Sequence, residues 1–153
     1  MYPSILQPFF IRHQCLELFV PDPVLLNEAY KKQQVAAGSL YWAKVWPSAT
    51  GLCIFLQDNL FYIQNRRVLE LAAGPGLPGI FCAVHAKHVC ISDVAPQAIA
   101  LIQQSAIHHQ LKNISCRVID WSNLPDMQLP EVVLLSDINY EPPQFAQLLL
   151  VIH

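Results

Sequence analysis

Residues 68–79, with the sequence VLELAAGPGLPG, constrain the fold of this chain more than any other segment. The segment opens with a short apolar run bounded by breaker residues, which is typical of a strand buried in a parallel sheet. Three of the chain's five glycines follow: Gly74, Gly76 and Gly79. The next residues are apolar again, and Pro78 suits the first turn of a helix. The segment therefore predicts a strand, a glycine turn and a helix, an arrangement that lets the backbone approach a bound nucleotide closely.

The spacing of the three glycines fits the fingerprint G-x-G-x-x-G of dinucleotide-binding proteins, so NAD(P) is one candidate ligand. Two features of the segment favour a different ligand. Glu70 places a carboxylate inside the strand, and Pro75 and Pro78 remove two N–H donors from the turn. A turn that has few donors and lies beside a carboxylate suits a cationic amino group better than a pyrophosphate.

The pattern V-L-E-L-x-x-G-x-G resembles the first motif of the class I S-adenosylmethionine-dependent methyltransferases. This resemblance implies that S-adenosylmethionine is the cofactor and that the glycine turn makes room for it. It also implies that the acidic residue of the strand lies near the methionine part of the cofactor. The cofactor-binding residues expected here are Glu70, Ala72, Gly74, Gly76 and Gly79.

An aromatic segment, residues 41–46 with the sequence YWAKVW, precedes the glycine region. Ser48 is a suitable N-cap for the helix predicted after it, in which apolar residues recur at helical spacing. The aromatic side chains can simply seal the edge of the sheet. The pattern W-x-x-x-W-P-S also resembles the protein lysine methyltransferases of the methyltransferase 16 group, which implies that this segment borders the cofactor and that Trp46 contacts it.

Asp93 follows the next predicted strand, residues 88–92, and Pro96 then opens a predicted helix. Strand, helix and strand in this order predict a right-handed βαβ unit of a parallel sheet. A carboxylate at the end of the second strand can accept hydrogen bonds from both hydroxyls of a ribose, so we expect Asp93 to bind ribose, with Val94 beside it. The alternative is that Asp93 only stabilises the start of the following helix.

His108 and His109 end the helix that begins at Pro96. Because they are adjacent, their side chains point to different faces, and no further ligand lies at metal-binding spacing. We expect both to lie in solvent and to interact with the helix dipole.

Asp120 and Trp121 follow a third predicted strand, residues 115–119. In the family that the chain resembles, the loop after this strand holds the adenine ring. The resemblance therefore implies that Asp120 accepts a hydrogen bond from the exocyclic amine and that Trp121 covers the ring, roles that suit both side chains. The alternative is a polar strand end with an aromatic residue that caps the core.

Ser136 ends the most continuously apolar predicted strand, residues 132–136, and Asp137-Ile138-Asn139-Tyr140 follows it. This segment resembles the D-x-x-Y motif after the fourth strand of the lysine methyltransferases. The resemblance implies that Ser136 lies at the cofactor and that Asp137 and Tyr140 are catalytic. They would orient the attacking nitrogen and stabilise the charge that develops on it. A carboxylate favours a cationic acceptor, so the expected reaction is N-methylation of a protein lysine.

Together these patterns predict an α/β fold, a partial Rossmann-like class I methyltransferase sheet of four parallel strands in the order 3-2-1-4 with helices on both faces. Residues 1–40 are expected to form an N-terminal appendage or lid, with two short strands and a helix over 24–34. Residues 41–153 are expected to form the cofactor-binding domain, ending in a helix over 144–153. The resemblance implies a seven-stranded sheet, so we expect this domain to lack its C-terminal strands. The fourth strand would then be an apolar edge, which favours homo-oligomer contacts or a partner that completes the sheet.

Composition limits the partners and the compartment. Apolar residues make up 54% of the chain and charged residues 13%, so much of the chain must be buried in the core or in an interface. A net charge of −2 gives no basis for binding nucleic acid or an anionic membrane. No apolar run reaches the roughly 18 residues that span a bilayer. The five cysteines are scattered without metal-binding spacing, which argues against zinc and disulfides and favours the cytoplasm.

Three other functions stay open at this point. An NAD(P)-dependent oxidoreductase shares the glycine spacing but leaves Glu70 and residues 137–140 unexplained. A noncatalytic module that keeps the cofactor fold and acts through its exposed sheet edge is consistent with the missing strands. An RNA or small-molecule methyltransferase shares every feature except the D-x-x-Y match, and an RNA substrate would also require a basic patch.

Overall fold

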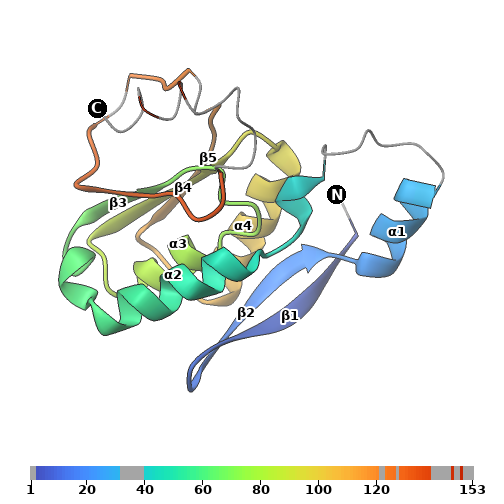
Figure 1. Cartoon of the computed structure of the whole chain (residues 1–153), viewed down its shortest axis with the longest axis horizontal. Coiled ribbons are helices and arrows are strands. Elements are labelled where there is room, and N and C mark those ends of the chain that lie inside the picture. The colour runs from blue at the N-terminus through green and yellow to red at the C-terminus, as the bar shows by residue number, and fades with distance from the viewer. Residues whose placement is uncertain are drawn as a thin grey trace.

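The computed structural model describes residues 3–31, 40–120, 123–126 and 128–138, together with Ala146 and Leu149. These residues form an antiparallel hairpin and a parallel sheet connected by helices (Figure 1). The strands are β1 (Ser4–Ile11), β2 (Gln14–Pro21), β3 (Arg67–Glu70), β4 (His88–Asp93), β5 (Ile114–Val118) and β6 (Val132–Leu134). The helices are α1 (Pro23–Lys31), α2 (Pro47–Asp58), α3 (Leu77–Ala83) and α4 (Pro96–His108), with 3-10 turns η1 (Tyr41–Ala43) and η2 (Leu60–Tyr62).

The larger sheet has the strand order β5-β4-β3-β6, and each neighbouring pair is parallel. The predicted order 3-2-1-4 is therefore confirmed. Glu70 is paired with Ile91 on one side and with Leu134 on the other, which aligns the carboxyl ends of three strands. The strand β6 ends two residues earlier than the sequence predicts, at Leu134.

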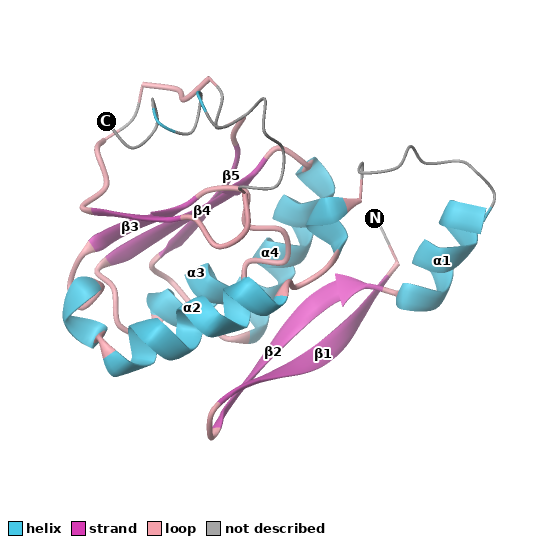
Figure 2. Cartoon of the chain, in the orientation of Figure 1, coloured by secondary structure: helices cyan, strands magenta, loops and turns pink. Residues whose placement is uncertain are grey.

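The described helices α2, α3 and α4 lie on one face of this sheet, as Figure 2 shows. Alternate strand residues point to the two faces. Val68 and Val89 belong to the large core with the helices, whereas Leu69 and Cys90 form a smaller cluster on the opposite face. The helix predicted over residues 144–153 lies outside the described residues, so a helix on the second face stays a prediction. Among the described helices, none combines the length and the hydropathy that crossing a membrane requires.

Proline starts the helices that follow the loops at the carboxyl edge. Pro47, Pro78 and Pro96 occupy the first or second position of α2, α3 and α4, and none of these helices has a side-chain cap. Proline suits these positions because its missing N–H would have no partner in the first turn. The prediction that Ser48 caps α2 is wrong, because the helix begins at Pro47 and its cap residue is Trp46, two positions before Ser48.

The N-terminal hairpin is packed into the core through one face of β2. Leu16, Leu18 and Val20 are almost fully buried and, with Ile11 of β1, belong to the same cluster as the helices. The hairpin packs against α4 and α2, and it lies beneath them in Figure 1. Both strands are longer than predicted, and together they form a third layer below the helices.

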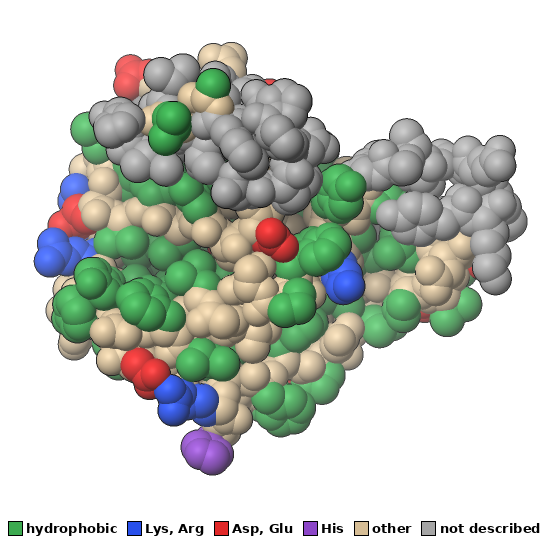
Figure 3. Space-filling view, in the orientation of Figure 1, with side chains coloured by type: hydrophobic (Ala, Val, Ile, Leu, Met, Phe, Trp, Pro, Cys, Tyr) green, Lys and Arg blue, Asp and Glu red, His purple; other side chains and the backbone are tan. Residues whose placement is uncertain are grey.

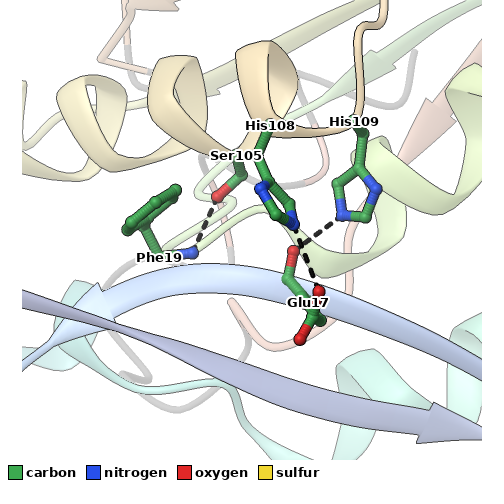
Figure 4. A network of polar contacts seen from close by, with 5 residues as sticks. All are labelled: Glu17, Phe19, Ser105, His108 and His109. Atoms are coloured by element: carbon green, nitrogen blue, oxygen red, sulfur yellow. Dashed lines mark hydrogen bonds and ion pairs between the residues drawn. The ribbon is translucent and has the colours of Figure 1, made fainter.

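A polar network joins β2 to the end of α4 (Figure 4). The Phe19 N–H donates to Ser105 Oγ at 2.9 Å, and the Ser105 hydroxyl donates to the Leu101 carbonyl. His109 Nε2 donates to the Glu17 carbonyl at 2.7 Å, and His108 Nε2 lies 3.2 Å from Glu17 Oε2. His108 is exposed, as predicted, and His109 is partly buried. The contacts of both histidines with Glu17 were not predicted, because this partner lies more than 90 residues away along the chain.

Aromatic side chains gather on the surface where α2 meets η2. Phe55 stacks on Tyr62 with ring centroids 5.8 Å apart, and Phe61 lies 4.2 Å from Tyr62. All three are about half exposed, and hydrophobic side chains gather over this region in Figure 3. Some of the many apolar side chains of this chain therefore lie on its surface and not in its core.

Replacing Ser105 with alanine is expected to lower the free energy of unfolding by about 1–2 kcal/mol, because the Phe19 N–H would lose its acceptor. Urea unfolding followed by circular dichroism measures this change. Gln103→Ala on the exposed side of the same helix is the control and should change stability by less than about 0.5 kcal/mol. Equal effects of the two substitutions would contradict the proposed role of this hydrogen bond.

Candidate active site at the carboxyl edge of the sheet

The loops that follow the four parallel strands meet at one edge of the sheet. Backbone hydrogen bonds hold them together: Ala73 N–H to Ser92 O at 2.9 Å, Leu71 N–H to Leu134 O at 3.2 Å and Ile119 N–H to Asp93 O at 3.0 Å. Ligands of open α/β sheets bind at this edge. The structure thus brings together the loops that carry the predicted site residues.

The turn between β3 and α3 has a backbone conformation that favours glycine. Gly74 and Gly76 have φ of 54° and 80°, and Ala72 has φ of 50°. A Cβ atom on Gly74 would lie 3.1 Å from the Trp42 carbonyl oxygen. Two of the motif glycines are therefore required by the path of the backbone and, at Gly74, by the close approach of another loop.

Asp93 supports this turn from the end of β4. Its Oδ2 accepts the Gly74 N–H and its Oδ1 accepts the Ala95 N–H, both at 2.8 Å. Burial raises the pKa of the Asp93 carboxyl, and these backbone N–H groups oppose the shift. Each oxygen keeps a second lone pair, so the carboxylate can still accept a hydrogen bond from a ligand. Val94, next to it, is 62% exposed.

Glu70 lies beneath the turn and not in the open crevice. Its side chain is fully buried on the helix side of the sheet, and its Oε2 accepts the Gly79 N–H at 2.8 Å. Burial raises the pKa of this carboxyl to about 8, opposed by the Gly79 N–H and reinforced by Asp93. The carboxyl therefore holds the turn from below, and its expected place near the methionine part of a cofactor stays a prediction.

Gly79, the third glycine of the motif, is required because of its neighbours in the core. A Cβ atom on Gly79 would lie 2.5 Å from Glu70 Oε2 and 2.6 Å from side-chain atoms of Ile91. A glycine is therefore needed at position 79 because the buried Glu70 carboxyl leaves no space for a side chain. The backbone there does not have the left-handed conformation that favours glycine at Gly74 and Gly76.

The aromatic segment borders the glycine turn, and whether it also borders the cofactor stays a prediction. The carbonyls of Trp42 and Lys44 lie closest to the position of a Gly74 Cβ. Trp46 Nε1 donates to the Tyr41 carbonyl at 3.1 Å, and Lys44 Nζ lies 4.8 Å from the Trp46 ring centroid. These contacts fix the orientation of Trp46, and its contact with a cofactor stays a prediction.

The remaining predicted site residues follow β5 and β6. Asp120 is exposed directly after the end of β5. Ser136 is partly buried and Asp137 is exposed, while Ile138 anchors their loop in the interior. Trp121 and Tyr140 lie outside the described residues. The two carboxylates of these loops are therefore accessible at the same edge as the glycine turn.

Some residues that shape the site were not predicted from the sequence. Trp42 and Ala95 contribute backbone groups, whose position depends on the fold alone. Ser92 is fully buried, and its hydroxyl donates to the Glu70 carbonyl at 2.8 Å. The sequence indicates a role for Ser92 only in that it is a polar residue inside an apolar strand.

The cysteines of the described chain are all free. Burial raises the pKa of the Cys53 and Cys82 thiols and that of Cys116 to about 11, so these groups stay protonated. Within the described ranges, no three His, Cys, Asp or Glu side chains are arranged to hold a metal ion.

Comparison with known proteins agrees with this geometry. Residues 22–153 match the lysine methyltransferase family. The chain belongs to this family. It is 30% identical over 135 residues to protein N-lysine methyltransferase METTL21A of Xenopus tropicalis, covering 86% of the chain and 60% of the relative. It is 33% identical over 118 residues to histone-arginine methyltransferase METTL23 of Xenopus laevis, covering 73% of the chain and 50% of the relative. The chain thus spans about half of these relatives' length.

Solved structures share the fold of this family member. A tRNA m1G37 methyltransferase of M. jannaschii superposes with a TM-score of 0.61 at 17% identity, over 97% of the chain and 39% of that protein. A complex of aTrm5 with tRNALeu gives a TM-score of 0.63 at 15% identity, over 98% of the chain and 37% of that protein. At these identities the likeness shows the methyltransferase fold alone.

The residues present at the edge fit S-adenosylmethionine. Asp93 retains lone pairs for a ribose diol at the carboxyl end of β4. The turn approaches neighbouring loops so closely at Gly74 that no Cβ fits there without displacing its neighbours. No Lys or Arg side chain forms an ion pair with Glu70 or Asp93 in the described part of the chain, so the local charge suits a cationic cofactor.

Gly79→Ala is expected to lower the free energy of unfolding by about 2–3 kcal/mol, because the new Cβ would overlap Glu70 and Ile91. Gly51→Ala is the matched control, since Gly51 is also helical and has no atom within 4 Å of an added Cβ. That control should stabilise the chain by about 0.5–1 kcal/mol. Denaturant unfolding compares the two, and a neutral Gly79→Ala would contradict the packing described.

Proposed function

We propose that this chain forms the cofactor-binding part of an S-adenosylmethionine-dependent methyltransferase that methylates the side-chain nitrogen of a protein lysine. The observation that carries the proposal is the glycine turn between β3 and α3, held by Asp93 at the carboxyl edge of the sheet. Family membership supports the same activity. Because the chain spans about half of its relatives' length, the proposal concerns the part of the site that this chain supplies.

The proposed roles of the residues combine the positions of the described ones with what the family resemblance implies. Asp93 would accept hydrogen bonds from the ribose hydroxyls, and the turn from Ala72 to Gly76 would face the methionine end. Asp120 and Trp121 would hold the adenine. Trp46, Val94 and Ser136 would complete the border of the cofactor site, as the family resemblance implies.

When bound, S-adenosylmethionine supplies a methyl group on a positively charged sulfur, which needs alignment more than activation. The chain's own contribution is to orient the acceptor nitrogen and to lower the cost of its changing charge. Asp137 is exposed at the end of β6, where its carboxylate would attract a cationic side chain. Tyr140 would complete the D-x-x-Y pair.

A protein lysine is the preferred acceptor because the matching family is that of the lysine methyltransferases. An arginine is the second candidate, because relatives at similar identity are named histone-arginine methyltransferases. Both side chains are cationic and suit the Asp137 carboxylate. Peptides that carry either lysine or arginine as the sole acceptor would separate the two.

The charge, the exposed sheet edge and the cysteines of the chain support a proposal for its partners and its compartment. The chain would act on a protein and not on nucleic acid or a membrane, which its net charge of −2 supports. Homo-oligomer contacts would use the edge of β6, where Val133 is 41% exposed. A cytoplasmic location is supported by the free cysteines.

Calorimetric titration with S-adenosylhomocysteine tests the proposal. We expect the chain to bind it, and Asp93→Ala to weaken binding at least about tenfold by removing the acceptor for the ribose. Asp126→Ala, which removes an exposed acid outside the glycine turn, is the control and should bind normally. Binding of NAD instead of S-adenosylhomocysteine would overturn the proposal.

A further inference from the structure

Two buried carboxyl groups hold the same turn from neighbouring strands. Asp93 Oδ2 accepts the N–H of Gly74 at the start of the turn, and Glu70 Oε2 accepts the N–H of Gly79 in the first turn of α3. The side chain of Glu70 is fully buried and that of Asp93 nearly so. Two potential negative charges therefore lie under one loop without a cation of the described chain beside them.

The surroundings of Glu70 disfavour its charged form. The titratable groups that face it are Cys53 from α2, Cys82 from α3 and Asp93 from β4. The two thiols are neutral and Asp93 is acidic, so none of them compensates a carboxylate. Glu70 Oε1 is buried and has no hydrogen-bond partner among the described residues. A buried carboxylate with one oxygen unsatisfied is costly, and protonation removes that cost.

We propose that Glu70 sets the charge selectivity of the crevice: its carboxyl is protonated while the turn above it is free, and it releases that proton when a cationic ligand binds over the turn. Glu70 is a positioning residue in this scheme, because its carboxyl is buried beneath the turn and accepts the N–H of Gly79. The inference rests on the proposed function, since S-adenosylmethionine is the cationic ligand. In the step, the O–H bond of Glu70 breaks, its proton passes to solvent and the carboxylate stays beneath the turn.

This arrangement distinguishes the methyl donor from its product. S-adenosylmethionine carries a positive sulfonium, whereas S-adenosylhomocysteine carries a neutral thioether. The field of the Glu70 carboxylate is weakly screened because protein surrounds the group on all sides. The sulfonium compound therefore gains more from the ionised form of Glu70, so the site favours the donor and releases the product.

Proton release measured by calorimetry tests the inference. Each compound is titrated near neutral pH in buffers with different ionisation heats, and the slope gives the protons released. We expect S-adenosylmethionine to release more protons than S-adenosylhomocysteine, with a difference of up to about one. The ligand amino group also titrates in this range and is more acidic in S-adenosylmethionine, because the sulfonium is positive, so its contribution is measured with Glu70→Gln and subtracted.

The pH dependence has a definite sign. The free chain binds up to one more proton than the complex between the lowered pKa of Glu70 in the complex and its pKa in the free chain, which is about 8. The affinity for S-adenosylmethionine relative to S-adenosylhomocysteine should therefore rise with pH, by up to about tenfold per unit, and level off above pH 8.

Glu70→Gln separates charge from hydrogen bonding, because its amide oxygen can still accept the Gly79 N–H but the group cannot ionise. In this variant only the contribution of the ligand amino groups to the difference in proton release and to its pH dependence should remain, while binding of both compounds persists. Asp126→Asn, an exposed acid outside the turn, should behave as the unmodified chain. If Glu70→Gln kept the full difference, the inference would be overturned and the proposed function would stand. If neither compound bound the unmodified chain, both would fall.

A second measurement does not require the variant to fold. Carboxyl carbons of the free chain, labelled with carbon-13, are followed by nuclear magnetic resonance as the pH is raised. We expect one glutamate to titrate near pH 8, and addition of S-adenosylmethionine to lower that midpoint. A free chain in which every glutamate titrates in its ordinary acidic range would contradict the inference.

Discussion

Two buried carboxyl groups hold the glycine turn on which the site depends. Asp93 accepts the N–H of Gly74 and Glu70 accepts the N–H of Gly79, so acids from two neighbouring strands hold both ends of the turn. Groups so deeply buried need hydrogen bonds to persist, and the backbone N–H groups of the turn provide them. The Glu70 contact also explains why residue 79 is a glycine, because a Cβ atom there would overlap the carboxyl.

The rest of the fold keeps this turn in place. Parallel pairing of β3 with β4 sets Glu70 and Asp93 on adjacent strands, and α3 covers Glu70 from the helix side. The hairpin adds a further layer through Ser105 and the paired histidines at the end of α4. The helices α3 and α4, which follow the loops at this edge, begin with proline, whose missing N–H would have no partner in the first turn. Membership of the lysine methyltransferase family is consistent with each of these features.

The sheet order and the edge that carries the site were predictable from sequence because they depend on local patterns: apolar runs, glycine turns and an acid after each strand. Asp93 was placed correctly at the edge for this reason. The direction of the Glu70 side chain was not predictable, since it depends on which face of a strand the helices cover. Nor were the contacts of His108 and His109, because their partner Glu17 lies more than 90 residues away along the chain. Trp121 and Tyr140 stay predictions, as they lie outside the described residues.

The most direct test of the account is a map of where S-adenosylhomocysteine acts on the chain. Amide resonances labelled with nitrogen-15 are recorded by nuclear magnetic resonance with and without the compound. The account predicts that the largest shifts fall on Gly74, Gly76 and the amides after β4 and β5, with little change in the hairpin. Shifts concentrated in the hairpin or at the amino ends of the strands would contradict the claim that the glycine turn forms the cofactor site.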